Sequence, residues 1–208
     1  MKCITHPCYF PSISQYSVLV QANELIFEKE DNYQKQTNRN RMYISGPNGL
    51  QILNIPVKNS NQKHQKYKDI LIDNDSDWQK NHLKSLETAY KSSPFYDLLI
   101  DEFDAVFKKN NTFLFDLNLK TIELVNECLG IKMDYNFTTE YFTDLENQVI
   151  DFRPLVNGKK DSNIIEPYMQ VFQEKEGFLN NLSILDLLFN EGRAAVGYLK
   201  SQNIKTIF

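Results

Sequence analysis

The sequence predicts an α/β fold in which an N-terminal βαβ unit and a mixed sheet precede a mainly helical C-terminal half. Two observations predict it. Apolar runs at residues 4–10 and 24–30 flank a segment with helical spacing, and such a unit favours a parallel strand pair with a right-handed crossover. After residue 76, apolar side chains recur mainly at helical spacing. We expect residues 1–208 to form a single domain, with a possible seam at 72–78.

The N-terminal unit is bounded by local signals. The first strand, 4–10, stops at Pro11. Ser12 or Ser14 can cap the next helix, because a side-chain oxygen accepts a hydrogen bond from a free backbone N–H group. Residues 24–30 then alternate between two faces, as a strand does.

A hairpin is predicted next. Residues 41–45 and 50–57 form its strands, and the Gly-Pro-Asn-Gly segment 46–49 supplies its turn. The polar segment 58–68 is expected to be an exposed loop, and 69–73 a short strand.

Helices should dominate the rest of the chain. Ser76 and Gln79 have the spacing of a capping box for a helix. The apolar stripe of that helix consists of Trp78, His82, Leu86, Ala89 and Tyr90. Further helices are predicted after Ser93-Pro94 and over 113–129, where Gly130 ends the helix. Two more are predicted over 184–190, after Asn181 or Ser183, and over 194–199. Residues 149–152 are expected to form an edge strand.

Composition narrows the class of protein. The formal net charge is -4, which excludes the broad positive surface of a general nucleic-acid binder. No run approaches the roughly 20 apolar residues of a membrane helix. The three cysteines have no paired spacing, so we expect no disulfide framework and a cytoplasmic location.

His6 and Asp31 are the candidate catalytic residues. His6 ends the first predicted strand, where open α/β sheets bind ligands, and it can act as a general acid or base. The following helix should offer free N–H groups to an anion. Asp31 follows the second strand and would lie beside His6 if the strands pair. A structural turn histidine and a solvated loop carboxylate are the alternatives.

The candidate substrate-binding residues surround this pair. Arg39 and Arg41 would point to one side of an extended segment, where two guanidinium groups can hold a phosphate or carboxylate. A basic pair on a surface strand is the alternative. The remaining candidates for orienting a substrate are Tyr9, Tyr16, Gln34, Lys35, Asn38 and Asn40.

Two other residues are weighed against structural roles. His82 lies on an apolar stripe, which is more typical of a core histidine than of a ligand, and Glu87 one turn further could share an edge of the site. Cys8 is expected to be a buried, inert thiol. The sequence contains no metal-binding or Gly-rich phosphate-binding motif, so no metal is predicted and the cofactor stays unknown.

Several blocks together resemble the WbqC-like family: HPCYFPSISQY, LIFEKEDNYQKQTNRNR, LNIPVK, HLKSLETAYKSSPFY and NLSILDLLFNEG. The likeness is greatest to the version found in Bacteroidetes-type bacteria. It implies a role in surface-polysaccharide (O-antigen) or cell-envelope metabolism, such as acyl or aminoacyl transfer to an amino sugar or nucleotide sugar. His6 stands where the family opening, QPYFFPYIGYF, usually has Gln, and that opening has no thiol at the position of Cys8.

Three functions follow as hypotheses. The first is a transferase that acts on a small anionic or nucleotide-linked substrate. The second is a nucleotidyltransferase-like enzyme, although the chain lacks the paired histidines of the HIGH motif. The third is a non-catalytic binding or scaffold protein of an envelope pathway, which would carry an exposed apolar patch on its helical half.

Overall fold

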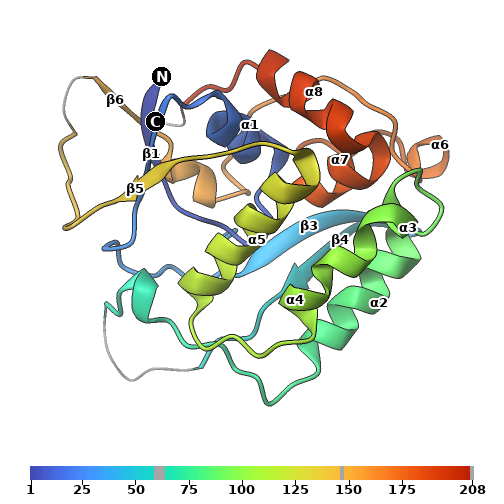
Figure 1. Cartoon of the computed structure of the whole chain (residues 1–208), viewed down its shortest axis with the longest axis horizontal. Helices are drawn as coiled ribbons and strands as arrows, with labels where there is room; N and C mark the ends of the chain where they lie inside the picture. Colours follow the sequence, from blue (N-terminus) through green and yellow to red (C-terminus); the bar gives the residue numbers. More distant parts are fainter. Residues whose placement is uncertain (59–63, 146–147, 207–208) are drawn as a thin grey trace.

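The fold contains two sheets in the part of the chain that the structure describes, a computed structural model of residues 1–58, 64–145 and 148–206. Among these residues, one sheet has four parallel strands in the order β5-β2-β1-β6, and the other is an antiparallel pair (Figure 1). The parallel strands are β1 (Lys2–Thr5), β2 (Glu24–Phe27), β5 (Tyr135–Phe137) and β6 (Val149–Asp151). The predicted α/β class is confirmed.

The N-terminal βαβ unit is also confirmed. Helix α1 (Ile13–Gln21) connects β1 to β2, and the two strands pair in parallel with Cys3 opposite Leu25. Ser12 caps α1, since its Oγ accepts from the backbone N–H of Gln15 at 3.4 Å. Cys3 and Leu25 are buried in the hydrophobic core.

The first two strands are shorter than predicted. β1 ends at Thr5, and residues 6–11 leave the sheet as a loop in which Phe10 has a φ of 39°. Tyr9 and Phe10 are fully buried in the hydrophobic core outside the sheet. An apolar run is therefore buried here without being a strand, and His6 lies just past the end of β1.

The strand order reverses next to β1. From β1 the chain adds β2 and then β5 on one side, and β6 on the other side. In open α/β sheets, ligands bind at the carboxyl ends of the strands beside such a switch point. The reversal between β1 and β6 therefore marks the loops after Thr5 and Asp151 as the place for a site.

The predicted hairpin is confirmed, although its second strand ends at Asn54 and not at residue 57. β3 (Arg41–Gly46) pairs with β4 (Gly49–Asn54), and the turn places Gly49 at a φ of 89°. The predicted strand at 69–73 is not a strand. A 3-10 turn, η1 (Tyr67–Asp69), is followed by single bridges from Leu71 and Ile72 to different segments, so no ladder forms there.

Helix α2 (Trp78–Tyr90) packs against β3. The predicted stripe of Trp78, His82, Leu86, Ala89 and Tyr90 is buried throughout, as expected. The capping box is wrong, because the helix begins one residue later than that motif requires. Asp77 is the N-cap residue, and Gln79 instead donates to the carbonyl of Lys109 at 2.7 Å.

The other helices follow the predicted segments with one exception. α5 (Leu114–Leu129) ends at Gly130 with a φ of 70°, as predicted. The helix expected after Ser93-Pro94 is broken into α3 (Tyr96–Leu99), η2 (Ile100–Phe103) and α4 (Asp104–Phe107). The remaining elements are η3 (Arg153–Val156), α6 (Gln173–Glu176), α7 (Ile184–Glu191), η4 (Gly192–Ala194) and α8 (Ala195–Ser201).

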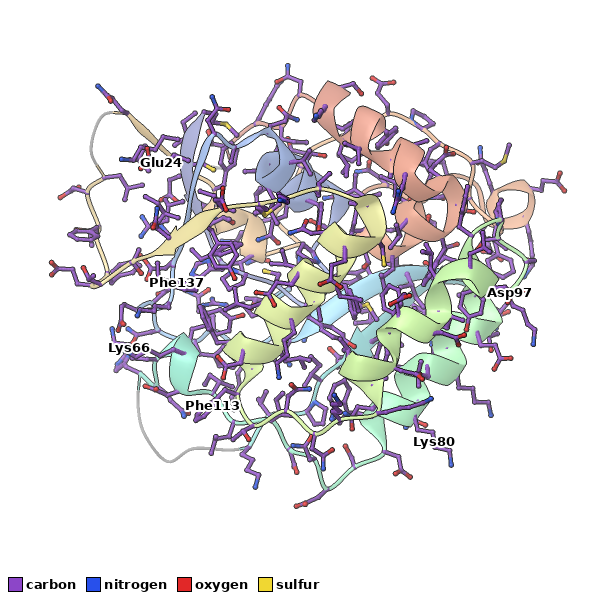
Figure 2. The ribbon with its side chains drawn as sticks, viewed as in Figure 1. Glu24, Lys66, Lys80, Asp97, Phe113 and Phe137 are labelled. Atoms are coloured by element: carbon purple, nitrogen blue, oxygen red, sulfur yellow. The ribbon has the colours of Figure 1, made fainter. Side chains whose placement is uncertain are left out.

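The core is continuous between the sheets and the helices. A hydrophobic cluster extends from Cys3 in β1 to Leu199 in α8, and α1 packs against both α7 and α8. Side chains fill the space between the ribbons, whereas labelled residues such as Lys80 and Asp97 lie at the periphery (Figure 2). Within the described ranges, every helix is too short or too polar to span a membrane.

Candidate functional site

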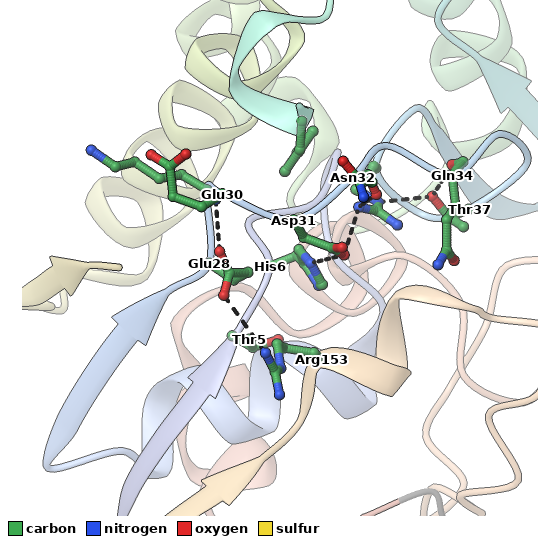
Figure 3. A network of polar contacts seen from close by, with 12 residues as sticks. Thr5, His6, Glu28, Glu30, Asp31, Asn32, Gln34, Thr37 and Arg153 are labelled. Carbon is green, nitrogen blue, oxygen red and sulfur yellow. Dashed lines mark hydrogen bonds and ion pairs between the residues drawn. The ribbon is translucent and has the colours of Figure 1, made fainter. Parts of the chain in front are cut away.

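A chain of polar contacts joins the loops after β1 and β2. Nε2 of His6 lies 2.9 Å from Oδ2 of Asp31, and Nη1 of Arg39 lies 3.3 Å from the same oxygen. His6 is 2% exposed, Arg39 is fully buried and the side chain of Asp31 is 16% exposed. Figure 3 shows His6 and Asp31 pointing toward one another. The expected convergence of these loops is therefore observed.

The charges of this pair follow from its surroundings. Burial lowers the pKa of His6 to about 4, against the hydrogen bond with Asp31, and the guanidinium of Arg39 adds to the lowering. Burial raises the pKa of Asp31. The hydrogen bond with His6 and the charge of Arg39 lower this pKa by more, so the net shift is downward. At neutral pH His6 is uncharged beside an ionised carboxylate.

This charge state determines the tautomer of His6. A carboxylate only accepts hydrogen bonds, so Nε2 of His6 must carry the proton that is donated to Asp31. The lone pair then belongs to Nδ1, which is buried and has no hydrogen-bond partner among the described residues. A neutral imidazole that is oriented by a carboxylate and has a vacant acceptor nitrogen can remove a proton from a ligand.

Arg39 is held from several directions. Its guanidinium lies 5.3 Å from the ring centre of Tyr67 and 5.7 Å from that of Tyr33, and its Nε donates to Oγ1 of Thr37. Its Nη1 also donates to the carbonyl of Asn32. Because Arg39 is fully buried, it stabilises Asp31 from the protein interior and does not stand beside Arg41 as an exposed pair.

A second polar cluster lies at the ends of β2, β5 and β6. Glu28 directly follows β2 and is fully buried, and its Oε1 accepts from Oγ1 of Thr138 at 2.8 Å. Its Oε2 lies 3.7 Å from Nη1 of Arg153. Arg153 also forms a two-point pair with Asp151, at 2.9 and 2.8 Å. Figure 3 shows Glu28 and Arg153 close to Thr5 and His6.

Side-chain hydrogen bonds hold the His6 loop in place. Nε2 of Gln15 donates to the carbonyl of His6 at 2.6 Å and to Oγ1 of Thr5 at 3.1 Å. The hydroxyl of Tyr67 donates to the carbonyl of Pro7, and Nδ2 of Asn118 donates to that hydroxyl. These residues come from α1, η1 and α5, so three elements fix the loop that carries the candidate base.

The expected anion site at the N-terminus of α1 is not available. The N–H group of Ile13 donates to the carbonyl of Leu182 at 2.9 Å, and that of Ser14 donates to Oδ1 of Asn181 at 2.9 Å. The N–H group of Gln15 donates to the capping oxygen of Ser12. The segment before α7 therefore satisfies the groups that an anion would use.

The aromatic candidates lie in the interior. The hydroxyl of Tyr9 contacts Nδ1 of His82 at 2.9 Å, while Nε2 of His82 donates to the carbonyl of Asn54. Burial lowers the pKa of His82 to about 4, so both of its nitrogens serve a neutral, structural contact. The hydroxyl of Tyr16 donates to Oδ1 of Asn126. The second turn of α2, which carries His82, therefore contacts Tyr9 of the opening loop through a buried hydrogen bond.

The remaining candidates are spread over the same loop and beyond it. Gln34 and Lys35 are exposed, Asn38 is buried, and Nδ2 of Asn40 donates to the carbonyl of Ile55. Arg41 begins β3 and is partly buried. Glu87 is exposed on α2 and pairs with Lys91, so it does not share an edge with His82.

The sequence predicts an inert thiol at Cys8 and no metal site. Cys8 is buried, and burial raises the pKa of its thiol to about 12, which suits an inert side chain. Across the described ranges, no group of three His, Cys, Asp or Glu side chains is placed to hold a metal ion.

Sequence reasoning missed Glu28, Thr138 and Arg153. Each lies one or two residues past the end of a parallel strand, and the strands are far apart in the chain. A usable signal existed at Arg153, a charged residue directly after the predicted strand 149–152, whereas Glu28 lies inside the predicted strand 24–30. The register of β5 and β6 against β1 and β2 was needed to bring them together.

The sheet order and the His6–Asp31 pair define an α/β protein with a candidate acid–base site at the carboxyl edge of a parallel sheet. The chain belongs to the WbqC-like protein family, whose family model matches residues 6–162. It is 28% identical over 218 residues to the uncharacterised protein Rv1507c of Mycobacterium tuberculosis, with 92% of this chain and 94% of that protein covered. No solved structure matches the chain.

Proposed function

We propose that this protein is a transferase of surface-polysaccharide or cell-envelope metabolism in a Bacteroidetes-type bacterium. Its substrate would be a small anionic or nucleotide-linked amino sugar, which accepts an acyl or aminoacyl group. The observation that carries the proposal is the buried, vacant Nδ1 of His6 beside the switch point of the sheet. Family membership supports the setting, because the resemblance to the WbqC-like family implies a role in surface-polysaccharide or cell-envelope metabolism.

The proposed acyl transfer needs one general base. The amino nitrogen of the sugar would form a bond to the carbonyl carbon of an activated acyl donor, and the bond from that carbon to its leaving group would break. Nδ1 of His6 would take the proton from the amine and return it to the leaving group. Asp31 would orient the imidazole and stabilise its transient positive charge, while Arg39 keeps Asp31 ionised.

The loop between Asp31 and Arg39 supplies groups at the solvent boundary. Gln34 and Lys35 are exposed on this loop, so they can contact an anionic or hydroxylated ligand without a structural change. The buried Arg39 would contribute through Asp31 and not by direct contact. Substitutions at Lys35 and Asp31 therefore test ligand binding and proton transfer separately.

The test is a transfer assay with nucleotide-linked amino sugars and short acyl thioesters, in which products are detected by mass spectrometry. Wild-type protein should form an acylated sugar, and Asp31→Asn should reduce the rate by at least about tenfold, because the neutral amide no longer stabilises the charged imidazole. Lys35→Ala should weaken substrate binding with a smaller effect on the maximal rate. Asp75→Asn, in an exposed loop, is the matched control. Equal rates for wild type and Asp31→Asn would contradict the assigned mechanism.

Nucleotidyl transfer is the second candidate, and the strand order favours it. Parallel sheets that reverse beside the first strand are widely used to bind nucleotides. Calorimetry with ATP and CTP, with and without Mg²⁺, distinguishes the two candidates. Metal-dependent nucleotide binding with release of pyrophosphate would favour nucleotidyl transfer over acyl transfer.

A further inference from the structure

A cavity of about 240 Å³ lies against one face of the parallel sheet. Ile4 of β1 and Ile26 of β2 line it, whereas their neighbours Cys3, Leu25 and Phe27 belong to the core on the other face. This is the alternation of a strand, so the cavity lies on the face away from the hydrophobic core. The segment 138–145, which follows β5, covers this face and contributes further lining residues.

We propose that this cavity binds the acyl portion of the substrate. The proposal deepens the transferase function given above and rests on it for the use of the bound acyl group. Apolar side chains form most of the lining, namely Ile4, Ile26, Phe137, Phe142, Leu145 and Val149.

The cavity shares a wall with the polar site. Thr138 lines the cavity, and its Oγ1 donates to Glu28 at 2.8 Å. Phe142 also lines it, and its carbonyl accepts from Nη1 of Arg153 at 2.8 Å. The guanidinium of Arg153 lies 4.9 Å from the ring centre of Tyr141. Glu28 and Arg153 therefore connect the covering segment to the carboxyl edge of the sheet, beside His6 (Figure 3).

The size of the cavity selects one part of a substrate. Pockets for drug-sized ligands measure roughly 300–1,000 Å³, so a cavity of about 240 Å³ cannot enclose a whole nucleotide-linked sugar. At roughly 30 Å³ for a group the size of a water molecule, it accommodates up to about eight methylene-sized groups. A short acyl chain fits this volume.

The chemistry of the lining favours an acyl chain over a sugar or a base. Hydroxyl groups and base edges lose hydrogen bonds to water when they enter an apolar cavity. The hydroxyl of Thr138 is already engaged, because it donates to Glu28 and accepts from the N–H group of Lys29. The other polar lining residues are Lys2, Thr139 and Asp144, of which Thr139 and Asp144 are exposed.

The experiment is calorimetry with straight-chain carboxylates from acetate to decanoate. Affinity for the wild-type protein should increase roughly fourfold for each methylene group, and should level off near about eight carbons. An affinity that does not depend on chain length would overturn the proposal. Binding of adenosine or uridine that excludes octanoate would assign the cavity to a nucleobase and would overturn it as well.

Two variants connect the result to this cavity. Ile26→Phe and Thr139→Phe each place a larger side chain at the lining, and both should reduce octanoate affinity by at least about tenfold. Ile164→Phe adds the same ring at a position that is 82% exposed and should leave the affinity unchanged. Thermal unfolding identifies any variant that fails to fold. Unchanged octanoate binding in both folded lining variants would also overturn the proposal.

Asp31→Asn separates this inference from the proposed reaction. The variant should lose transfer activity but keep the chain-length dependence, because Asp31 does not line the cavity. If the wild type shows chain-length dependence without any transfer activity, the acyl site stands and the proposed reaction fails.

Discussion

Nε2 of His6 lies 2.9 Å from Oδ2 of Asp31, although the two residues are 25 positions apart in the chain. Parallel pairing of β1 with β2 brings them together, since each follows one of these strands at the same edge of the sheet. His6 is only 2% exposed, so a positive charge on its imidazole would lose its hydration. Burial therefore keeps His6 neutral near pH 7. At neutral pH the imidazole therefore keeps one unprotonated nitrogen beside the ionised carboxylate.

The neutral state of His6 makes the protein sensitive to acid. The folded-state pKa is about 4 and the ordinary value is 6.5, so the unfolded chain binds more protons between these values. The free energy of unfolding must then decrease as the pH falls through this interval. We expect His6 to account for a loss of about 2 kcal/mol between about pH 7.5 and about pH 5.

Urea denaturation of His6→Gln at the two pH values measures this contribution. The variant should lose about 2 kcal/mol less than wild type on acidification. His82→Gln should behave in the same direction, because burial also lowers the pKa of His82 to about 4. If wild type and His6→Gln lose the same free energy, His6 is charged in the folded state and the assigned tautomer is wrong.

Asp186 in α7 should have the opposite pH dependence. It accepts hydrogen bonds from the hydroxyls of Tyr90 and Tyr168, and burial raises its pKa from 3.8 to about 6. Between these values the folded state binds more protons than the unfolded state, so the free energy of unfolding decreases as the pH rises. The ionised carboxylate should cost about 3 kcal/mol above pH 6.

Asp186→Asn removes this titration. The free energy of unfolding of the variant should depend less on pH between about pH 4 and about pH 6.5 than that of wild type. Chemical denaturation across this range gives the comparison. Parallel pH curves for the two proteins would show that Asp186 is not the group responsible.

Local signals predicted those parts of the fold that local interactions determine. Ser12 and Gly130 act within one helical turn, and the Gly-rich turn at 46–49 joins strands that are adjacent in the chain. The break of the helix after Pro94 was not predicted, because its residues keep helical spacing. Strand β5, with three residues, is too short to display an alternating pattern.

The candidate site likewise has residues that the sequence could predict and residues that only long-range strand pairing brings together. His6 and Asp31 could be predicted because their strands are consecutive and parallel. Arg153 reaches Glu28 only after β6 pairs with β1 on the other side, a contact between residues more than a hundred positions apart. The N–H groups of α1 are likewise satisfied by Asn181 and Leu182, which a pattern in residues 1–40 cannot indicate.

The hydroxyl of Tyr67 should make a measurable contribution to stability. It donates to the carbonyl of Pro7 at 2.6 Å and accepts from Nδ2 of Asn118, and the side chain is fully buried. Tyr67→Phe leaves buried polar groups with fewer partners, and should reduce the free energy of unfolding by about 1–3 kcal/mol. Tyr135→Phe is the matched control, because its hydroxyl bonds to an exposed Glu123. An equal loss for both variants would contradict a special role for the Tyr67 contact.

Two glycines should respond to alanine in opposite directions. Gly130 ends α5 with a φ of 70°, a conformation that alanine adopts only with strain, and an added Cβ would lie 3.4 Å from Cζ of Arg193. Gly197 lies inside α8, where an added Cβ would meet no described atom within 4 Å. Gly130→Ala should reduce the free energy of unfolding by about 1 kcal/mol, whereas Gly197→Ala should increase it by about 0.5–1 kcal/mol. Urea denaturation of both variants measures the two changes, and a stabilised Gly130→Ala protein would show that α5 does not end in the left-handed conformation.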